Sequence, residues 1–307
     1  MAKLGIIGAG HVGEIVAYTA ALRGGFSHIT LHDINEKRLD GVVSDLEDAT
    51  RFYPHNTRFI AGDVKDVAAS DMIVVCSGRI PEDAQRRKEY DNNEADVSDY
   101  IPKVMEAGFK GIFVVVTNPC DAIAYRVWKL SGMDASRVIG SGTALDTERS
   151  RTIIARLLDV SPENVESMML GEHGDSQFLP YSQVRINHIP WDRYLKDHDL
   201  AFDEAEVEKS VVYRGHRAFF GKGSTQYGIA NTVNAILDAV LYDEKKTLQV
   251  SALHKGEYGV DDVYVSTPCV IGKDGIEEVI ELELTDDERK KYRDSAEIIR
   301  SYQKRWS

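Results

Sequence analysis

Short apolar runs alternate with stretches of helical spacing along the first half of the chain. Two of the runs, MIVVC at 72–76 and IFVVV at 112–116, are apolar at every position. Strands buried on both faces of a parallel sheet have this pattern. It predicts strands at 3–7, 29–32, 58–61, 72–76, 112–117 and 137–139, and helices at 13–22, 35–49, 97–107 and 121–130. Such alternation predicts a doubly wound parallel sheet with ligands beyond the carboxyl ends of its strands.

The pattern changes after Gly142. Long helices are predicted at 145–158, 226–241 and 285–306, and shorter strands near 166–170, 181–189 and 263–271. No repeat, low-complexity tract or linker separates the two halves. We therefore expect an α/β protein of two domains, a Rossmann-type doubly wound domain over residues 1–142 and an α+β substrate domain over residues 143–307.

The end of the first predicted strand carries a glycine pattern that suits a dinucleotide. Gly8, Gly10 and Gly13 form a G-x-G-x-x-G frame before the next helix, and Asp33 ends a second apolar run twenty residues after Gly13. The glycines allow a tight turn, close approach of a pyrophosphate and close packing of helix on strand, and the helix N-terminus attracts phosphate. A carboxylate at 33 binds the ribose and repels a 2′-phosphate, so NAD is expected rather than NADP. The alternative is an ordinary glycine-rich turn without a ligand.

Composition narrows the class of protein but does not identify its chemistry. The chain has 307 residues, of which 43% are hydrophobic and 28% charged, and its net charge of −13 argues against a general binder of nucleic acid or membrane surfaces. Its three cysteines form no C-x-x-C, its first strand begins at once, and no apolar run reaches membrane-spanning length. We expect a cytoplasmic protein that binds neither nucleic acid nor membranes and has no metal site.

One histidine and two residues of an upstream helix form the candidate catalytic set. His173 lies between glycines in LGEHGDS at 170–176. Asp146 and Arg149 lie three residues apart in ALDTERSR at 144–151, so they share one face of a helix. Each also has a structural interpretation. The histidine can belong to a turn, Asp146 can form a capping box with Thr143, and the arginine can be a surface cation.

Six features occur in the order and approximate spacing of one family. They are GAGHVG at 8–13, Asp33, TNP at 117–119, IGSGTALD at 139–146, LGEHGDS at 170–176 and GKGSTQYGIA at 221–230. The chain resembles the L-lactate/malate dehydrogenase superfamily, NAD-dependent L-2-hydroxy acid dehydrogenases, over essentially its whole length. LGEHGDS with the upstream LDxxR is far more specific than the glycine motif. The resemblance implies NAD as cofactor, a small 2-oxo or 2-hydroxy acid as substrate, and a homodimer or homotetramer.

The resemblance also assigns roles, and the chemistry of the residues agrees with them. His173 is expected as the base in oxidation and the acid in reduction, because imidazole titrates nearest to working pH. Asp146 is expected to hold the imidazole and favour its charged form, and Arg149 to bind the substrate carboxylate through two hydrogen bonds. Asn118, before a cis bond to Pro119, is expected near the nicotinamide and the reacting oxygen. The expected cofactor-binding residues are Gly8, Gly10, His11, Val12, Gly13, Asp33, Ser77, Gly78, Thr117, Asn118 and Ile229, and Thr225 and Gly215 are expected in the substrate pocket.

A long polar stretch at 79–92, RIPEDAQRRKEYDN, is either a solvated loop or a mobile lid. The family places in this loop an arginine that polarises the substrate carbonyl, ahead of an asparagine. Counting seven residues back from Asn93 gives Arg86, with Arg87 as its rival. Closure of a lid would expel water and strengthen each charge inside.

The same loop departs from the family pattern at the position that selects the substrate. Lactate enzymes carry glutamine there and malate enzymes arginine, whereas this chain offers Pro81 or Glu82. Neither binds a second carboxylate and Glu82 repels one, which argues against malate and oxaloacetate. Gly215, where lactate enzymes carry alanine, enlarges the pocket. Both departures resemble L-2-hydroxyisocaproate dehydrogenases and predict a bulky substrate, although activity on pyruvate can remain because a pocket methylene is worth only ~1–3 kcal/mol.

Other functions remain as alternatives. L-Lactate dehydrogenase acting on pyruvate is the runner-up and malate dehydrogenase is third. A non-catalytic NAD-binding sensor would have lost a member of the set at 146, 149 and 173, and all three are present. A metal- and NAD-dependent glycosidase needs a cysteine/histidine metal site, for which no motif is apparent.

Overall fold

The computed structural model of the chain describes residues 1–79 and 86–303, with residue 86 described by its backbone alone. Its first half contains β1 (Ala2–Ile7), α1 (His11–Arg23), β2 (Phe26–His32), α2 (Glu36–Asp48), β3 (Arg58–Ala61), α3 (Val64–Ala68), β4 (Met72–Val75), α4 (Arg86–Glu106), β5 (Ile112–Val115), α5 (Cys120–Ser131) and β6 (Val138–Gly140). Its second half contains α6 (Ala144–Leu158), β7 (Val165–Glu166), β8 (Arg185–Ile186), β9 (Ile189–Pro190), α7 (Trp191–Asp197), α8 (Glu204–Lys222), α9 (Tyr227–Leu241), β10 (Lys246–Lys255), β11 (Asp261–Gly272), β12 (Gly275–Val279) and α10 (Asp286–Gln303).

One large sheet runs through both halves of the described chain. Its nine strands have the order β12-β11-β10-β6-β5-β4-β1-β2-β3. The six strands from β6 to β3 are parallel, in the 3-2-1-4-5-6 order of a Rossmann fold, so the predicted doubly wound sheet is confirmed. Strands β10, β11 and β12 extend this sheet in antiparallel fashion, while β7, β8 and β9 form a separate small sheet.

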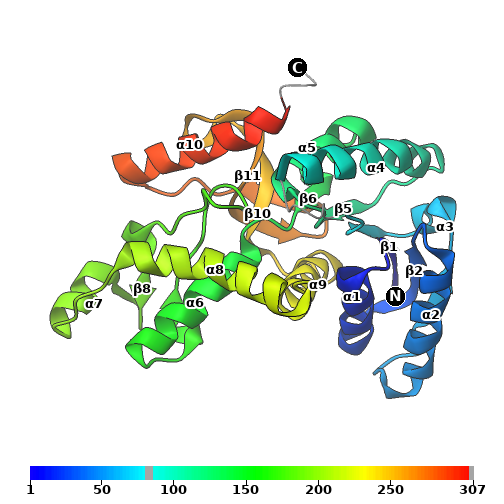
Figure 1. Ribbon diagram of the computed structural model, residues 1–307, viewed down its shortest axis with the longest axis horizontal. Coiled ribbons are helices and arrows are strands. Elements are labelled where there is room, and N and C mark those ends of the chain that lie inside the picture. The colour runs from blue at the N-terminus through cyan, green and yellow to red at the C-terminus, as the bar shows by residue number, and fades with distance from the viewer. Residues whose placement is uncertain (80–85, 304–307) are drawn as a thin grey trace.

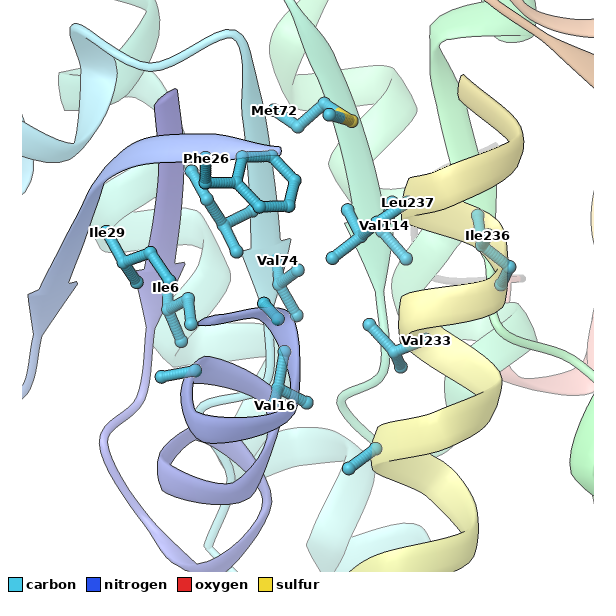
Figure 2. Close-up of a cluster of buried hydrophobic side chains, with 14 of the residues drawn as sticks. Ile6, Val16, Phe26, Ile29, Met72, Val74, Val114, Val233, Ile236 and Leu237 are labelled. Carbon is cyan, nitrogen blue, oxygen red and sulfur yellow. The ribbon is translucent and has the colours of Figure 1, made fainter. Parts of the chain in front are cut away.

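Helices cover both faces of the sheet, which explains why its central strands are apolar at every position. Side chains alternate between the faces of a strand, so Leu4 and Ile6 of β1 join one hydrophobic core while Ile7 joins the other. Helices α1, α2 and α9 cover the first face, and α3, α4, α5 and α10 cover the second (Figure 1). Figure 2 shows the first core, where Val233 and Leu237 of α9 approach the strands beside Val16 of α1.

A third core lies in the second half, where α6, α7 and α8 pack together apart from the large sheet (Figure 1). Residues that follow β1 and β5, namely Val12, Val116 and Asn118, line one cavity together with His173. Among the described helices, none combines the length and the apolar character that a membrane crossing requires.

Several predicted elements differ from the structure. The polar stretch at 79–92 is helical from residue 86 onward, because α4 begins there, so the predicted long loop is shorter than expected. The segment at 166–170 is a strand only at its start, and 181–189 consists of a 3-10 turn followed by the short strands β8 and β9. The helix predicted at 285–306 begins at Asp286 and is described as far as Gln303.

Candidate active site

The glycine loop between β1 and α1 is closely packed on one side and open on the other. Gly8 has a φ of +105°, and a Cβ at Gly13 would lie 1.9 Å from the carbonyl oxygen of Gly8, so both positions require glycine. A Cβ at Gly10 would meet nothing within 4 Å. Gly10 precedes the first residue of α1, and no side chain caps the helix there. The space above Gly10, at an uncapped helix N-terminus, fits a pyrophosphate.

Asp33 follows β2 and is fixed beside this loop. One carboxylate oxygen accepts a hydrogen bond from the Ala9 N–H at 2.8 Å, and the other accepts one from the Asn35 N–H at 2.8 Å. The carboxylate therefore has a defined place next to the glycine loop, which suits an acceptor for ribose hydroxyls. His11, the first residue of α1, is exposed nearby.

The ends of β4 and β5 are joined through hydroxyl groups. The Thr117 hydroxyl donates to the carbonyl oxygen of Ser77 at 2.5 Å, and the Ser77 hydroxyl lies 2.9 Å from that of Tyr100. Gly78 is exposed next to them. The hydroxyls of Ser77 and Thr117 therefore hold the ends of the two strands in a fixed arrangement.

A single buried carboxylate connects the two proposed substrate-facing groups. One oxygen of Asp146 lies 2.7 Å from Nδ1 of His173, and the other accepts a hydrogen bond from Nη1 of Arg149 at 2.7 Å. The Asp146 side chain is 0% exposed. Burial opposes its ionisation, but the charges and hydrogen bonds of His173 and Arg149 outweigh burial and hold the pKa of Asp146 below its ordinary value. The carboxylate therefore stays charged and orients both partners.

These groups open into a cavity of about 310 Å³. Eight of the predicted site residues line it: Val12, Asn118, Asp146, Arg149, His173, Gly215, Thr225 and Ile229. One wall comes from α8, which contributes Val212, Gly215, His216, Phe219 and Phe220. The cavity thus extends from Val12, beside the glycine loop, to the candidate catalytic set.

Comparisons with known proteins agree along the whole chain. The NAD binding domain of lactate/malate dehydrogenase matches residues 2–140, and the alpha/beta C-terminal domain of lactate/malate dehydrogenase matches residues 143–305. This chain belongs to the lactate/malate dehydrogenase family. It is therefore an NAD-dependent 2-hydroxy acid oxidoreductase.

Relatives within the family match this chain over nearly the whole length of both proteins. The dehydrogenase is 37% identical to L-lactate dehydrogenase 3 of Bacillus thuringiensis subsp. konkukian over 306 residues, which are 98% of this chain and 97% of the relative. It is 36% identical to L-lactate dehydrogenase 1 of Bifidobacterium longum subsp. longum over 304 residues, 98% of this chain and 96% of the relative. The crystal structure of the minor L-lactate dehydrogenase from Enterococcus mundtii in the ligands-bound form matches with a TM-score of 0.96 at 31% identity, covering 100% of this chain and 98% of that one.

Thr143 and Asp146 do not form a capping box. Thr143 precedes the first residue of α6, but its side chain caps no helical N–H and its hydroxyl donates to the carbonyl oxygen of Met169 at 2.5 Å. The structural interpretation of Asp146 is therefore wrong, since its carboxylate binds His173 and Arg149 instead.

Only part of the loop that carries the expected specificity position and the expected catalytic arginine is described. Pro81 and Glu82 lie outside the described residues. Arg86 begins α4, but its side chain is not described. Arg87, the rival for the catalytic arginine, donates to the carbonyl oxygen of Ser301 and lies over the Tyr302 ring of α10. Arg87 does not line the cavity, so Arg86 stays the prediction for the catalytic arginine.

Asn93, the asparagine that follows the expected loop arginine in the sequence, connects the start of the loop to the turn that carries Asn118. Asn93 of α4 is 2% exposed. Its Oδ1 accepts from the Arg79 N–H at 2.8 Å, and its Nδ2 donates to the carbonyl oxygen of Asn118 at 2.7 Å. The Asn118–Pro119 bond is cis, as the resemblance implies. Asn93 therefore fixes the start of the loop against the turn that carries Asn118.

Asp121, which no sequence motif indicated, holds the backbone of His173. It lies in the first turn of α5, is 2% exposed, and accepts a hydrogen bond from the His173 N–H at 2.8 Å. Burial raises the pKa of Asp121 to about 6 despite this hydrogen bond. In the sequence Asp121 resembles an ordinary acidic residue at a helix start, and its partner lies 52 residues away.

Proposed function

We propose that this dehydrogenase interconverts a 2-oxo acid and the corresponding L-2-hydroxy acid, with a preference for bulky side chains of the isocaproate type. The observation that carries the proposal is the Asp146 carboxylate, which holds a potential proton donor and a potential carboxylate-binding cation in one cavity. NAD, when bound, supplies the oxidising or reducing equivalent beside this set.

Arg149 is proposed to bind the substrate carboxylate. Its guanidinium is partly buried, bonded through Nη1 to Asp146, and lines the cavity. A planar guanidinium held on one side by a carboxylate can bind a second carboxylate through two parallel hydrogen bonds, which a lysine cannot do. This contact would place the 2-oxo group of the substrate toward His173.

His173 is proposed to exchange the proton. Its Nδ1 faces the charged Asp146, which stabilises the protonated ring, and we assign Nε2 to the proton given to the carbonyl oxygen in reduction. In oxidation the same nitrogen takes the hydroxyl proton back. Arg86 is proposed to polarise the carbonyl from the lid, and Asn118 to hydrogen-bond near the reacting oxygen.

The walls of the cavity support a large, singly charged substrate. The α8 wall is mostly apolar, and Gly215 contributes no side chain to it. Arg149 is the one lysine or arginine among the described lining residues, whereas Glu89 and Asp175 add acidic groups. A second substrate carboxylate would find no described lysine or arginine as partner besides Arg149, which supports the argument against malate and oxaloacetate.

The second candidate is L-lactate dehydrogenase acting on pyruvate. It is favoured by relatives named L-lactate dehydrogenase that are 36% and 37% identical to this chain. Both candidate functions use the same catalytic set. They differ only in the size of the substrate side chain that the cavity accepts.

Initial rates with pyruvate, oxaloacetate, 2-oxoisocaproate and phenylpyruvate, compared as kcat/KM with NADH, decide between these candidates. We expect the two bulky acids to lead and oxaloacetate to be poorest. Highest kcat/KM on pyruvate would establish the second candidate, and highest kcat/KM on oxaloacetate would refute both. His173→Ala should abolish most activity, and a variant that keeps it would overturn the assignment of the proton donor.

Three further proposals concern organisation. Residues 1–142 are proposed to hold NAD and residues 143–307 to supply the catalytic set and the pocket. The free thiols of Cys76, Cys120 and Cys269 suit a reducing compartment, so we propose a cytoplasmic location. A homodimer or homotetramer is proposed from the family alone.

A further inference from the structure

Gln177 lines the cavity and carries a buried, unsatisfied acceptor. The residue is 7% exposed and lines the cavity together with Arg149 and His173. Its Nε2 donates to the carbonyl oxygen of Gly174 at 2.9 Å. Its Oε1 is buried and finds no hydrogen-bond partner among the described residues.

The orientation of this amide is determined by its surroundings. If the two ends of the Gln177 amide were exchanged, an oxygen would face the Gly174 carbonyl oxygen, and two acceptors would repel each other. The observed orientation is therefore the stable one, and it leaves the acceptor as the unsatisfied end. A buried acceptor without a partner costs about 1–3 kcal/mol, which a ligand with a donor can recover.

The turn that carries Gln177 is rigid and also carries the catalytic histidine. Leu170 and Phe178 exchange both backbone hydrogen bonds, at 2.9 and 3.1 Å, and close the segment between them. Gln177 lies four residues after His173 in this closed segment. The unsatisfied oxygen is thus fixed relative to the reacting centre.

Besides Asp146, two carboxylates also line the cavity. Glu89 of α4 is 7% exposed and lines the cavity, and so does the exposed Asp175. Carboxylates only accept hydrogen bonds when ionised. Among the described lining residues, Arg149 is the one lysine or arginine, and the proposed function assigns it to the substrate carboxylate. The other lining residues of these four charged types are aspartates and a glutamate. The lining also contains His216 and the hydroxyls of Ser141, Ser224 and Thr225, which can donate, so the feature that calls for a donor is the unsatisfied Oε1 of Gln177.

We propose that Gln177 is a specificity-determining residue whose Oε1 accepts a hydrogen bond from a hydroxyl or N–H group on the substrate side chain. The preferred substrates are then bulky 2-oxo acids with a donor near the end of the side chain, such as a phenol. This inference rests on the proposed function and names the chemical class of substrate within it. Sites that hydrogen-bond a substrate group discriminate strongly against analogues that lack it, because the buried partner is then unpaired.

Phenylpyruvate and 4-hydroxyphenylpyruvate test the proposal, because they differ by one hydroxyl group. The product is quantified by chromatography, and the ratio of kcat/KM between the two acids is measured on one enzyme preparation, so a general loss of activity cancels. We expect the wild-type enzyme to favour the hydroxylated acid by about tenfold or more, and Gln177→Leu to reduce this ratio to near one. Gln183→Leu, which alters a glutamine that does not line the cavity, should keep the wild-type ratio.

The outcomes separate this proposal from the proposed function. A wild-type ratio near or below one overturns the role of Gln177, while the proposed preference for bulky acids stands if both aromatic acids exceed pyruvate. A high ratio that survives in Gln177→Leu also overturns it, because another group must then bind the hydroxyl. If neither aromatic acid is reduced and pyruvate is, both proposals fail together. Gln177→Met gives a second apolar variant of similar size should the leucine variant not fold.

Discussion

Replacement of Gly10 by alanine tests coenzyme binding separately from the stability of the fold. The backbone at Gly10 has φ −78° and ψ −165°, which alanine can adopt, and an added Cβ would meet nothing within 4 Å. At Gly13 the added Cβ would lie 1.9 Å from the Gly8 carbonyl oxygen. The first substitution should therefore spare the free enzyme, whereas the second should disrupt the contact between helix and strand.

The expected magnitudes follow from this geometry. In the free enzyme, alanine restricts the unfolded chain and stabilises by about 0.4–1 kcal/mol, but it is a poorer residue than glycine before a helix by about the same amount. The melting temperature of Gly10→Ala should thus stay within roughly 2–4 °C of wild type. A methyl group in the space proposed for the pyrophosphate costs about 1–3 kcal/mol, which weakens NADH binding on the order of 5- to 150-fold.

Fluorescence titration with NADH and thermal unfolding without coenzyme measure the two effects separately. Gly41→Ala is the matched control, because a Cβ at this exposed position of α2 also meets nothing within 4 Å and the residue lies outside the glycine loop. It should keep the wild-type affinity and gain slightly in stability. Wild-type affinity in Gly10→Ala would refute the placement of the pyrophosphate. A fall in its melting temperature beyond about 10 °C would refute the packing argument.

Three further substitutions test the catalytic side of the cavity. A Cβ at Gly215 would lie 3.2 Å from Nη1 of Arg149 and would narrow the cavity, so Gly215→Ala should lower kcat/KM for both acids through Arg149 and, through the narrower pocket, about tenfold more for 2-oxoisocaproate than for pyruvate in steady-state assays. Asp146→Asn removes the charge that stabilises protonated His173, so kcat/KM for reduction should fall by about 10²–10⁴, and the pH–rate profile should shift to lower pH. The folded-state pKa of Asp121, about 6, exceeds its ordinary value of 3.8, so its ionisation removes up to about 3 kcal/mol of stability as the pH rises from 4 to 7. In melting curves over this range, the melting temperature of Asp121→Asn should therefore rise relative to that of the wild type as the pH rises. A difference that stays constant with pH would contradict the cause assigned to the raised pKa.

The parallel sheet could be predicted because its signal is local. A strand covered on both faces has to be apolar throughout, and the run beginning at Met72 has no other simple interpretation. The strand at 58–61 was predicted with the bounds that the structure has. Helix α8 has few buried residues, and β10 carries buried polar side chains at Gln249, Ser251 and His254, so neither has a regular apolar pattern. Both went unpredicted for this reason.

The candidate site was predictable only where a family motif marked it. His173, Asp146 and Arg149 belong to sequence motifs, and the structure brings them into one cavity. Asn93 and Gln177 act through an amide whose partners are main-chain groups, and Asn93 reaches a carbonyl 25 residues away. A backbone partner leaves no pattern in the side chains of the sequence, so such contacts become visible only in three dimensions.

Two buried carboxylates flank His173, the proposed proton donor, and their environments differ. Asp146 contacts the ring and has its pKa lowered by two cationic partners, so it is charged wherever the ring must be protonated. Asp121 contacts His173 only through the backbone N–H, its other oxygen accepts from the Ser266 hydroxyl at 3.4 Å, and burial raises its pKa to about 6. An amide oxygen can accept that backbone hydrogen bond as well as a carboxylate can, whereas it cannot replace the charge beside the ring. Asparagine at position 121 should therefore preserve the position of His173, while asparagine at position 146 should leave the ring in place but without the charge that makes it an acid.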